Sequence, residues 1–390
     1  MRICVVSGTF HPEPGGPPTY LSHLLPALIQ RGHGVSVVTY TDEPRSFRDD
    51  NTYGYPVWRI TRRQPIPLRL LEMTRRIIAV SAPADLLFVS DYGLPAAVAN
   101  LVRRKPLVIK NVSDFSWEFS TRHGWLPPGQ TIDQYQTAVH PVRVRWLQAV
   151  QTAYLRAATR IITPSHYIAG LVQGWGLPAE RIRVVYNAID LSPYRSLPAR
   201  ADQRATLGLP ADARLVVAIA RLVPWKHFDL VIAALAEVRQ HLPTARLLIV
   251  GDGPERAHLE SVAAPHGDLV TFVGAVSPSA VPGYLRAADA YVQFSTYEGL
   301  PHTVIEALAA GTPVVVSDIG GNLEVITHNE NGLVVPAQNV PALAAALHRL
   351  LTEPALAARL TVGGAATLPR FAWPALVEQT EAVLHEATTR

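Results

Sequence analysis

Short runs of Val, Ile and Leu alternate with amphipathic helical segments along almost the whole chain. Such apolar runs are typical of strands buried on both faces, and their alternation with helices indicates parallel sheets wrapped by helices. We expect one series of strands at residues 3–7, 35–39, 86–90, 107–110, 160–163 and 183–186, and a second at 215–220, 246–250, 269–272, 290–294 and 313–317. The two series predict two doubly wound α/β domains.

The boundary between the domains is predicted from turn-forming residues at 187–193, between the two series. A length of 390 residues suits about two domains. We therefore expect an N-terminal domain at 1–190 and a C-terminal domain at 191–370. In open α/β sheets, ligands bind outside the carboxyl ends of the strands, so candidate residues are sought there.

Composition excludes several classes of protein. With 48% hydrophobic and 17% charged residues, both domains should have full cores. The net charge is only +4 and no basic, aromatic-rich module is present, so no nucleic-acid partner is expected. Cys4 is the single cysteine, which suits a reducing cytoplasm. The first apolar run is too short for a signal peptide or a membrane span, so a cytoplasmic protein is predicted.

The segment 57–80 carries six arginines against Glu72 alone, mixed with large apolar side chains. That mixture is found in interfacial helices and in sites for anionic acceptors, so peripheral contact with the inner face of a membrane is one hypothesis. Pro65 and Pro67 interrupt the segment and favour the other hypothesis, a solvated surface segment.

Two carboxylates, Glu298 and Glu306, lie eight positions apart across a turn and the start of an apolar helix. Eight residues are slightly over two helical turns, so both side chains can point into one pocket. Pro301 favours helix entry, and free amides at a helix start bind phosphate. Carboxylates for hydroxyls and amides for phosphate suit a nucleotide sugar, and the intervening residues Gly299, Leu300 and Pro301 join the candidate site.

Four other candidate segments lie at strand-to-helix junctions or at turns. Gly15 and Gly16 precede a helix expected at 19–30, where their amides could approach a ligand. Arg221 and Lys226 could converge on a diphosphate. The remaining segments are a turn containing Gly251 and Gly253, and residues 331–336. No dinucleotide fingerprint and no Walker lysine occurs, which argues against an oxidoreductase and against ATP hydrolysis.

Along the chain, the C-terminal segments follow in the order 221–226, 251–253, 298–306 and 331–336. With this order of segments, the chain resembles the retaining glycosyltransferases of family 4, which have the two-domain GT-B architecture. The resemblance covers nearly the whole chain and is specific in the C-terminal domain. It implies a nucleotide-sugar donor, expected to be a UDP- or GDP-sugar, and a hydroxyl acceptor on a glycan, lipid or small molecule. The acceptor would bind the N-terminal domain, around residues 53–76 and 117–146.

The resemblance also implies roles for the candidates. Arg221 and Lys226 would hold the diphosphate, Glu306 would bond the ribose hydroxyls, and Glu298 would lie beside the transferred sugar. The Gly15–Gly16 loop would close over the diphosphate from the other domain, and residues 371–390 would form a helix crossing back onto the N-terminal domain. The Arg/Lys pair would balance the leaving-group charge, so no metal and no cofactor is expected.

Asp114 departs from the pattern, because many relatives have a histidine there. Residues 110–118 resemble a subgroup with Gly-Asp-x-x-Trp-Glu, so Asp114 could replace the histidine or could cap a helix beginning at Phe115. The histidines show no metal spacing, and His302 is expected to line the sugar pocket. The family's retaining step needs no protein nucleophile. Two alternatives stay open: a sugar-nucleotide epimerase of the same fold and a non-catalytic sugar-nucleotide-binding protein.

Overall fold

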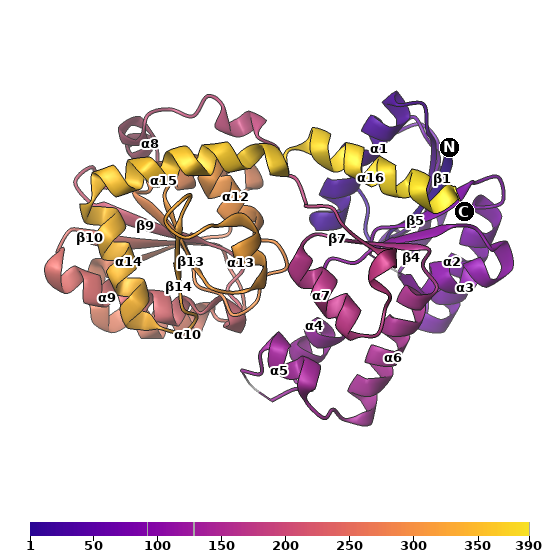
Figure 1. The fold of residues 1–390 in the computed structure, drawn as a ribbon, viewed down its shortest axis with the longest axis horizontal. Coiled ribbons are helices and arrows are strands. Elements are labelled where there is room, and N and C mark those ends of the chain that lie inside the picture. Colours follow the sequence, from indigo (N-terminus) through magenta and orange to yellow (C-terminus); the bar gives the residue numbers. More distant parts are fainter. Residues whose placement is uncertain (92, 128, 390) are drawn as a thin grey trace. The chain divides into compact units, whose positions relative to one another are not determined.

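A computed structural model describes residues 1–91, 93–127 and 129–389 (Figure 1). Its contacts divide the chain into two compact units. Unit 1 contains residues 1–185, apart from a short insertion at 129–132, and also residues 373–390. Unit 2 contains residues 186–372 and that insertion. Arg390, the end of the predicted C-terminal helix segment, lies outside the described residues.

Unit 1 is built on an eight-stranded sheet in which every neighbouring pair is parallel except β3 with β4. All residues of β5, β6 and β7 are buried, which explains why these runs are continuously apolar. The strand order is β3 (Phe47–Asp49), β4 (Val57–Thr61), β2 (Gly34–Thr41), β1 (Arg2–Val6), β5 (Leu86–Val89), β6 (Leu107–Lys110), β7 (Arg160–Thr163) and β8 (Ile182–Val184).

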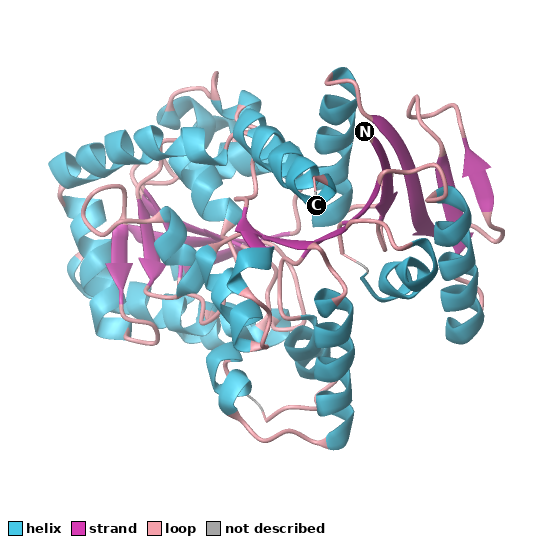
Figure 2. Ribbon diagram, turned by 45° about the vertical axis from the view of Figure 1, so that its right-hand side comes forward, coloured by secondary structure: helices cyan, strands magenta, loops and turns pink. Residues whose placement is uncertain are grey.

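Helices cover both faces of this sheet (Figure 2). The last helix of the chain, α16, contacts α1, β5, β6 and β7. The helices of the unit are α1 (Gly16–Gln30), α2 (Ile66–Val80), α3 (Gly93–Arg103), α4 (Phe115–Arg122), α5 (Ile132–Thr137), α6 (Val142–Arg156), α7 (His166–Gly174) and α16 (Trp373–Thr388).

Unit 2 has a six-stranded, wholly parallel sheet between two apolar layers. Its strand order is β11 (Val270–Gly274), β10 (Ala245–Val250), β9 (Arg214–Ile219), β12 (Ala290–Gln293), β13 (Val314–Ser317) and β14 (Leu333–Val335). Its helices are α8 (Arg200–Thr206), α9 (Phe228–His241), α10 (Arg256–Ala263), α11 (Val281–Ala287), α12 (His302–Ala309), α13 (Gly320–Val325), α14 (Val340–Thr352) and α15 (Pro354–Thr367).

The predicted strands are all present, with ends that differ from the prediction by no more than two residues, and the two doubly wound sheets are confirmed. Three short strands were not predicted: β3, β4 and β14. β4 was missed because it contains Arg59, whose guanidinium is buried and donates to the carbonyl of His11 at 2.5 Å. A buried arginine interrupts the apolar pattern on which the prediction of strands depends.

The basic segment 57–80 is therefore not one surface segment. Its first part is strand β4, and Arg62 beyond it bonds the Gly8 carbonyl and the Glu13 carboxylate at 2.7 and 2.8 Å. Its second part is α2, where the prolines begin a helix rather than interrupt a coil: Pro65 is the N-cap and Pro67 lies in the first turn. Among the described residues, no helix has both the length and the apolar character needed to cross a bilayer.

In both sheets the chain begins near the middle, builds outward to one side, and then crosses to build the other side. The change of direction falls between the adjacent strands β1 and β5 in unit 1, and between the adjacent strands β9 and β12 in unit 2. At such a switch point, the two loops leaving adjacent strands diverge to opposite faces and leave a crevice at the carboxyl edge. The candidate residues are found at these two edges.

Candidate functional site

In unit 2, the loops after β9 and β12 are bonded to each other at the switch point. The amide of Thr296 donates to the carbonyl of Trp225 at 2.9 Å. Lys226 ends a short 3-10 turn and pairs through Nζ with Oε1 of Glu298, which also accepts from Ser295 Oγ at 2.7 Å. The structure thus brings Lys226 and Glu298 together, with side chains only 16% and 12% exposed.

The turn after β10 supports the β9 loop from the other side. A side chain at Gly251 would place its Cβ 2.0 Å from the carbonyl oxygen of Ala220, and one at Gly253 would come within 2.3 Å of that of Leu222. The amide of Leu222 in turn donates to the carbonyl of Asp252 at 3.0 Å. These glycines allow the turn to pack directly on the loop that carries Arg221 and Lys226, whatever part they have in ligand binding.

Arg221 lies at the exposed end of this loop and forms no ion pair with another described residue. Its neighbour Leu222 is fully buried and anchors the backbone. The guanidinium is therefore available to an anion, in contrast to the ammonium of Lys226, which already has a carboxylate partner.

Glu306 lies on α12, for which Pro301 is the N-cap. Burial raises the pKa of its carboxyl to about 7, although a hydrogen bond with Tyr194 opposes the shift. Tyr291, fully buried on β12, has a pKa raised first by burial and then by the charges of both Glu298 and Glu306. Both carboxylates therefore act on one buried phenol of β12, and a pocket shared by the two glutamates stays a prediction.

The residues between the glutamates are shaped by α13. The amide of Gly321 donates to the carbonyl of Glu298 at 3.0 Å. A Cβ on Gly321 would lie 2.5 Å from that carbonyl oxygen and 2.7 Å from that of Gly299. Leu300 is half-buried and Pro301 is buried. Sequence reasoning missed Gly321, although Gly320-Gly321 follows a strand just as Gly15-Gly16 does.

In unit 1, Gly15 ends the exposed loop between β1 and α1, and Gly16, also exposed, is the first residue of α1. Gly15 is the N-cap of α1 and has a φ of 139°, which other residues rarely adopt, whereas a side chain on Gly16 would meet nothing within 4 Å. Across the switch point, Asp91 holds the β1 end by accepting from the amide of Gly8 at 2.6 Å and from Ser7 Oγ at 3.0 Å. Sequence reasoning did not single out Asp91.

Asp114 is the N-cap of α4, and one of the two hypotheses for it is thereby confirmed. Its Oδ1 accepts from Ser116 Oγ at 2.7 Å and from the amide of Trp117 at 3.1 Å, while Oδ2 accepts from Gln136 Nε2 at 2.9 Å. The side chain is 1% exposed. With both oxygens occupied, a catalytic role for Asp114 has no support in this arrangement and stays a prediction.

A buried lysine nearby in the sequence was not considered. Lys110 ends β6, is 3% exposed, and its Nζ has no hydrogen-bond partner among the described residues. The ammonium lies 4.3 Å from the ring centroid of Tyr20. Burial lowers the pKa of Lys110 to about 7, so this lysine can lose its charge near neutral pH.

Comparison with known proteins gives the class first. The solved structures most like this chain include HepE (Alr3699) from Anabaena in complex with UDP, with a TM-score of 0.79, 22% identity and coverage of 99% of this chain and 100% of that one. Sucrose-phosphate synthase from Thermosynechococcus elongatus has a TM-score of 0.78 and 26% identity, with coverage of 99% of this chain and 98% of that one. Together with the two switch-point sheets, these similarities establish the GT-B fold.

Two sequence families match, "Glycosyltransferase Family 4" over residues 14–193 and "Glycosyl transferases group 1" over residues 199–365. The chain belongs to glycosyltransferase family 4. It is 27% identical over 369 residues to the GDP-mannose-dependent alpha-(1-6)-phosphatidylinositol monomannoside mannosyltransferase of Mycobacterium tuberculosis, covering 90% of this chain and 89% of that protein.

Other relatives match over less of their length. The D-inositol 3-phosphate glycosyltransferase of Streptomyces bingchenggensis is 32% identical over 59% of this chain and 53% of its own. The lipopolysaccharide core biosynthesis glycosyltransferase LpsD of Rhizobium meliloti is 39% identical over 47% of this chain and 53% of its own length. The chain thus spans about half the length of these two relatives.

Proposed function

We propose that this protein transfers a sugar from a nucleotide-sugar donor to a hydroxyl acceptor with retention of configuration and without a metal. The observation that carries the proposal is the β9/β12 switch point, where Lys226 and Glu298 are paired and Arg221 is exposed beside them. A cation pair next to carboxylates provides for both the charged and the hydroxyl-rich halves of a nucleotide sugar.

In this proposal, Arg221 binds the diphosphate by its fork of donors and Lys226 provides a point charge that moves from Glu298 toward the phosphate when the donor binds. Glu306 accepts hydrogen bonds from the ribose hydroxyls. Glu298, relieved of part of its ion pair, accepts from hydroxyls of the transferred sugar. Gly251, Gly253 and the 299–301 turn shape the backbone of the site.

For the chemical step, we infer that the bond between the anomeric carbon and the phosphate oxygen breaks as the acceptor oxygen bonds to that carbon on the same face. The acceptor proton passes to the departing phosphate oxygen, so no protein nucleophile is needed. Negative charge grows on the diphosphate during this step, and Arg221 and Lys226 stabilise it.

UDP- and GDP-sugars are the expected donors. HepE has been crystallised with UDP, and the mycobacterial relative is named as GDP-mannose-dependent. A thermal-shift screen of UDP-, GDP-, ADP- and TDP-sugars tests the choice, because a ligand at a hundred times its dissociation constant stabilises by about 2.7 kcal/mol. Release of the nucleoside diphosphate only when an acceptor is present supports transfer. Release without acceptor-dependent product, or binding without turnover, would favour the epimerase or the binding protein.

The stereochemical part has its own test. Proton NMR of the product's anomeric signal should show an α-glycoside from an α-linked donor, and a β product would exclude the retaining step. Activity should persist in a chelator; if it vanished and returned with a divalent ion added to the reaction, the metal-free proposal would be wrong.

A membrane-bound acceptor is supported by one surface of unit 1. On α2, Ile66, Leu68 and Leu71 are exposed at 61%, 55% and 44%, and Arg75 and Arg76 on the same helix are exposed as well. We propose that α2 rests on an anionic membrane surface. Sedimentation with phosphatidylglycerol vesicles should carry the protein down, and vesicles of phosphatidylcholine alone should not. Equal sedimentation of an L68E/L71E variant would contradict the proposal.

A further inference from the structure

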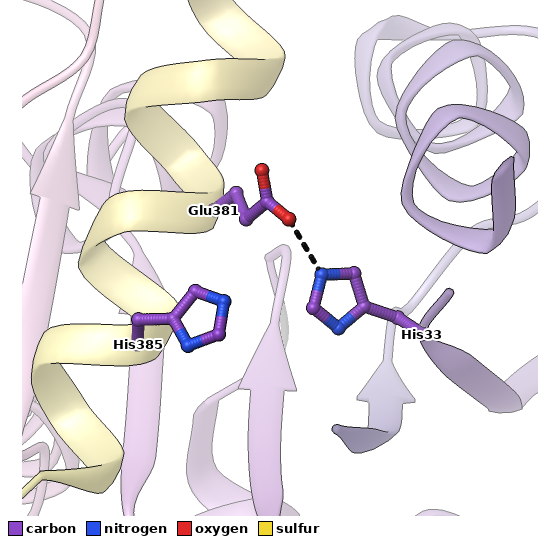
Figure 3. Close-up of side chains that lie close together, drawn as sticks. All are labelled: His33, Glu381 and His385. Carbon is purple, nitrogen blue, oxygen red and sulfur yellow. Dashed lines mark hydrogen bonds and ion pairs between the residues drawn. The ribbon is translucent and has the colours of Figure 1, made fainter. Parts of the chain in front are cut away.

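Three potential metal ligands of unit 1, none of them in the candidate sugar-transfer site, come together where the start and the end of the chain meet (Figure 3). His33 lies in the turn between α1 and β2, while Glu381 and His385 are one helical turn apart on α16. Residues four apart on a helix share one face. One ligand atom from each of the three side chains lies within 4.8 Å of the others.

His33 is held in place at this cluster. Its side chain is 5% exposed, and its Nε2 lies 2.7 Å from Oε1 of Glu381. Its Nδ1 lies 3.2 Å from the amino group of Met1. His385 is exposed, and its ring centroid is 5.6 Å from that of His33, which places the two imidazoles close enough to share a ligand.

Glu381 is prepared as an ionised ligand. Hydrogen bonds from His33 and Arg31 hold the pKa of its carboxyl below the usual value. Arg31 bonds Oε2 at 2.5 Å and leaves Oε1 directed at His33. Hydrogen-bonded partners of this kind orient ligands around metals, but the positive charge of Arg31 also weakens binding of a dication. These opposing effects predict micromolar rather than nanomolar affinity.

We propose that His33, Glu381 and His385 bind a zinc ion that fastens α16 to the rest of unit 1. Two imidazoles and one carboxylate are a ligand set that zinc uses, with water in a fourth position, whereas magnesium and calcium require mainly oxygen ligands. The ion would join an element from the start of the chain to one from its end.

For the pair His33 and Glu381, the geometry needs little adjustment. Two tetrahedral ligands about 2.1 Å from zinc lie about 3.4 Å apart, so His33 Nε2 and Glu381 Oε1 must separate by well under an ångström from their present contact. The proton of the His33 Nε2–H that now donates to Glu381 passes to solvent, while Nδ1 takes a proton from the Met1 ammonium that it contacts. The ring therefore stays neutral, and its Nε2 lone pair binds the ion. No other covalent bond changes.

The test uses the full chain, stripped of metal by a chelator that is then removed, and titrated with zinc chloride in a calorimeter. We expect one site with a dissociation constant of about 1 to 50 μM, and a melting temperature raised by roughly 2 to 5 °C at a hundredfold excess over that constant. Magnesium should do neither. Cobalt(II) should give the intense visible absorption of a tetrahedral site.

Variants separate this site from surface histidines. His385→Ala should weaken zinc binding at least 30-fold without loss of folding, because that side chain is exposed. His33→Ala should do the same, with folding checked by circular dichroism because this residue is buried. His258→Ala, which removes an exposed histidine of α10, is the matched control and should bind zinc like the native chain. Unchanged zinc affinity in His385→Ala, or absence of any thermal shift, would overturn the proposal.

Discussion

The carboxyl edges of the two sheets carry different chemistry, although the strand order crosses over in the same way in both. At the β9/β12 crossing of unit 2, the chain presents an exposed arginine, an ion-paired lysine and two carboxylates. At the β1/β5 crossing of unit 1, it presents an exposed glycine loop held by Asp91. Lys110, at the end of β6, is a cation of the same sheet edge, and burial lowers its pKa to about 7.

The difference shows that a fold positions a site without choosing its chemistry. In unit 2 the polar side chains at the switch point pair with each other, as Lys226 and Glu298 do, or are exposed, as Arg221 is. In unit 1 the polar side chains singled out bond the unit's own backbone, as Asp91 and Asp114 do. We therefore expect substitutions in unit 2 to change turnover and those in unit 1 to change mainly stability.

The largest expected effect is that of Lys226→Ala, which should lower turnover by roughly 100- to 1,000-fold, with a smaller change in donor Michaelis constant. The reason is that charge on the diphosphate grows as the glycosidic bond breaks. Arg221→Ala should behave alike. Arg239→Ala, which removes an arginine paired with Asp268 elsewhere in unit 2, is the control. Steady-state kinetics with a saturating acceptor measure the effect, and near-native turnover of Lys226→Ala would remove the contrast between the units.

Glu306→Gln should weaken donor binding by roughly 10- to 100-fold, because a hydrogen bond to a charged group is replaced by a neutral one. Calorimetry with the nucleoside diphosphate measures this. In the native protein, affinity should rise between pH 6 and pH 8 as the carboxyl, with its pKa near 7, loses its proton. Flat affinity over that range would contradict the assignment.

Glu306→Gln, which should weaken donor binding, should stabilise the folded protein at alkaline pH. The folded pKa of Glu306 is raised from 4.5 to about 7, so its contribution to stability is full below pH 4.5 and is lost as the pH rises through 7. The native protein should lose roughly 1 to 3 kcal/mol over this window, and Glu306→Gln should not. At pH 8 the variant should therefore melt higher than the native protein, and a lower melting point would show that Glu306 is stabilised rather than strained by its surroundings.

Asp114→Asn should cost roughly 1 to 3 kcal/mol of stability, because the new amide would face the Nε2 amide of Gln136. Gln136 cannot simply turn over, since its Oε1 accepts from Trp175 Nε1 at 2.8 Å. The double variant D114N/Q136E supplies an acceptor to both neighbours and should recover the melting temperature. If turnover recovers with it, Asp114 is a cap alone; a 10-fold or larger deficit in turnover that survives the recovery of stability would place it in catalysis.

The smallest effects are expected in the glycine loop. Gly15→Ala should lower the melting temperature by a few degrees, because alanine is strained at a φ of 139°. Gly16→Ala meets no neighbouring atom and should melt like the native protein. A raised donor Michaelis constant in Gly16→Ala with unchanged melting would show that the loop approaches the ligand, whereas equal melting of both variants would contradict the strain at Gly15.

The sequence predicted the sheets well because their cores are continuous apolar runs, as β6 and β7 show. It also pointed to the loops after β9, β10 and β12, because the carboxyl ends of parallel strands lie at one edge of a sheet. It did not predict partners such as Gln136 for Asp114, Tyr194 for Glu306 or His33 for Glu381, since these join residues far apart in the chain. Local periodicity holds no information on such pairs.

The placement of α16 has a consequence for how the protein is made. Unit 1 holds the first strand and the last helix, with all of unit 2 translated between them. In the finished protein α16 packs on β5, β6 and β7. During synthesis this face of the sheet stays exposed for the roughly 10 to 40 s that the ribosome needs to make unit 2. Unit 2 can fold as soon as it leaves the ribosome, so it should finish folding before unit 1. A chain truncated after unit 2 should expose the apolar face that α16 would cover and should aggregate.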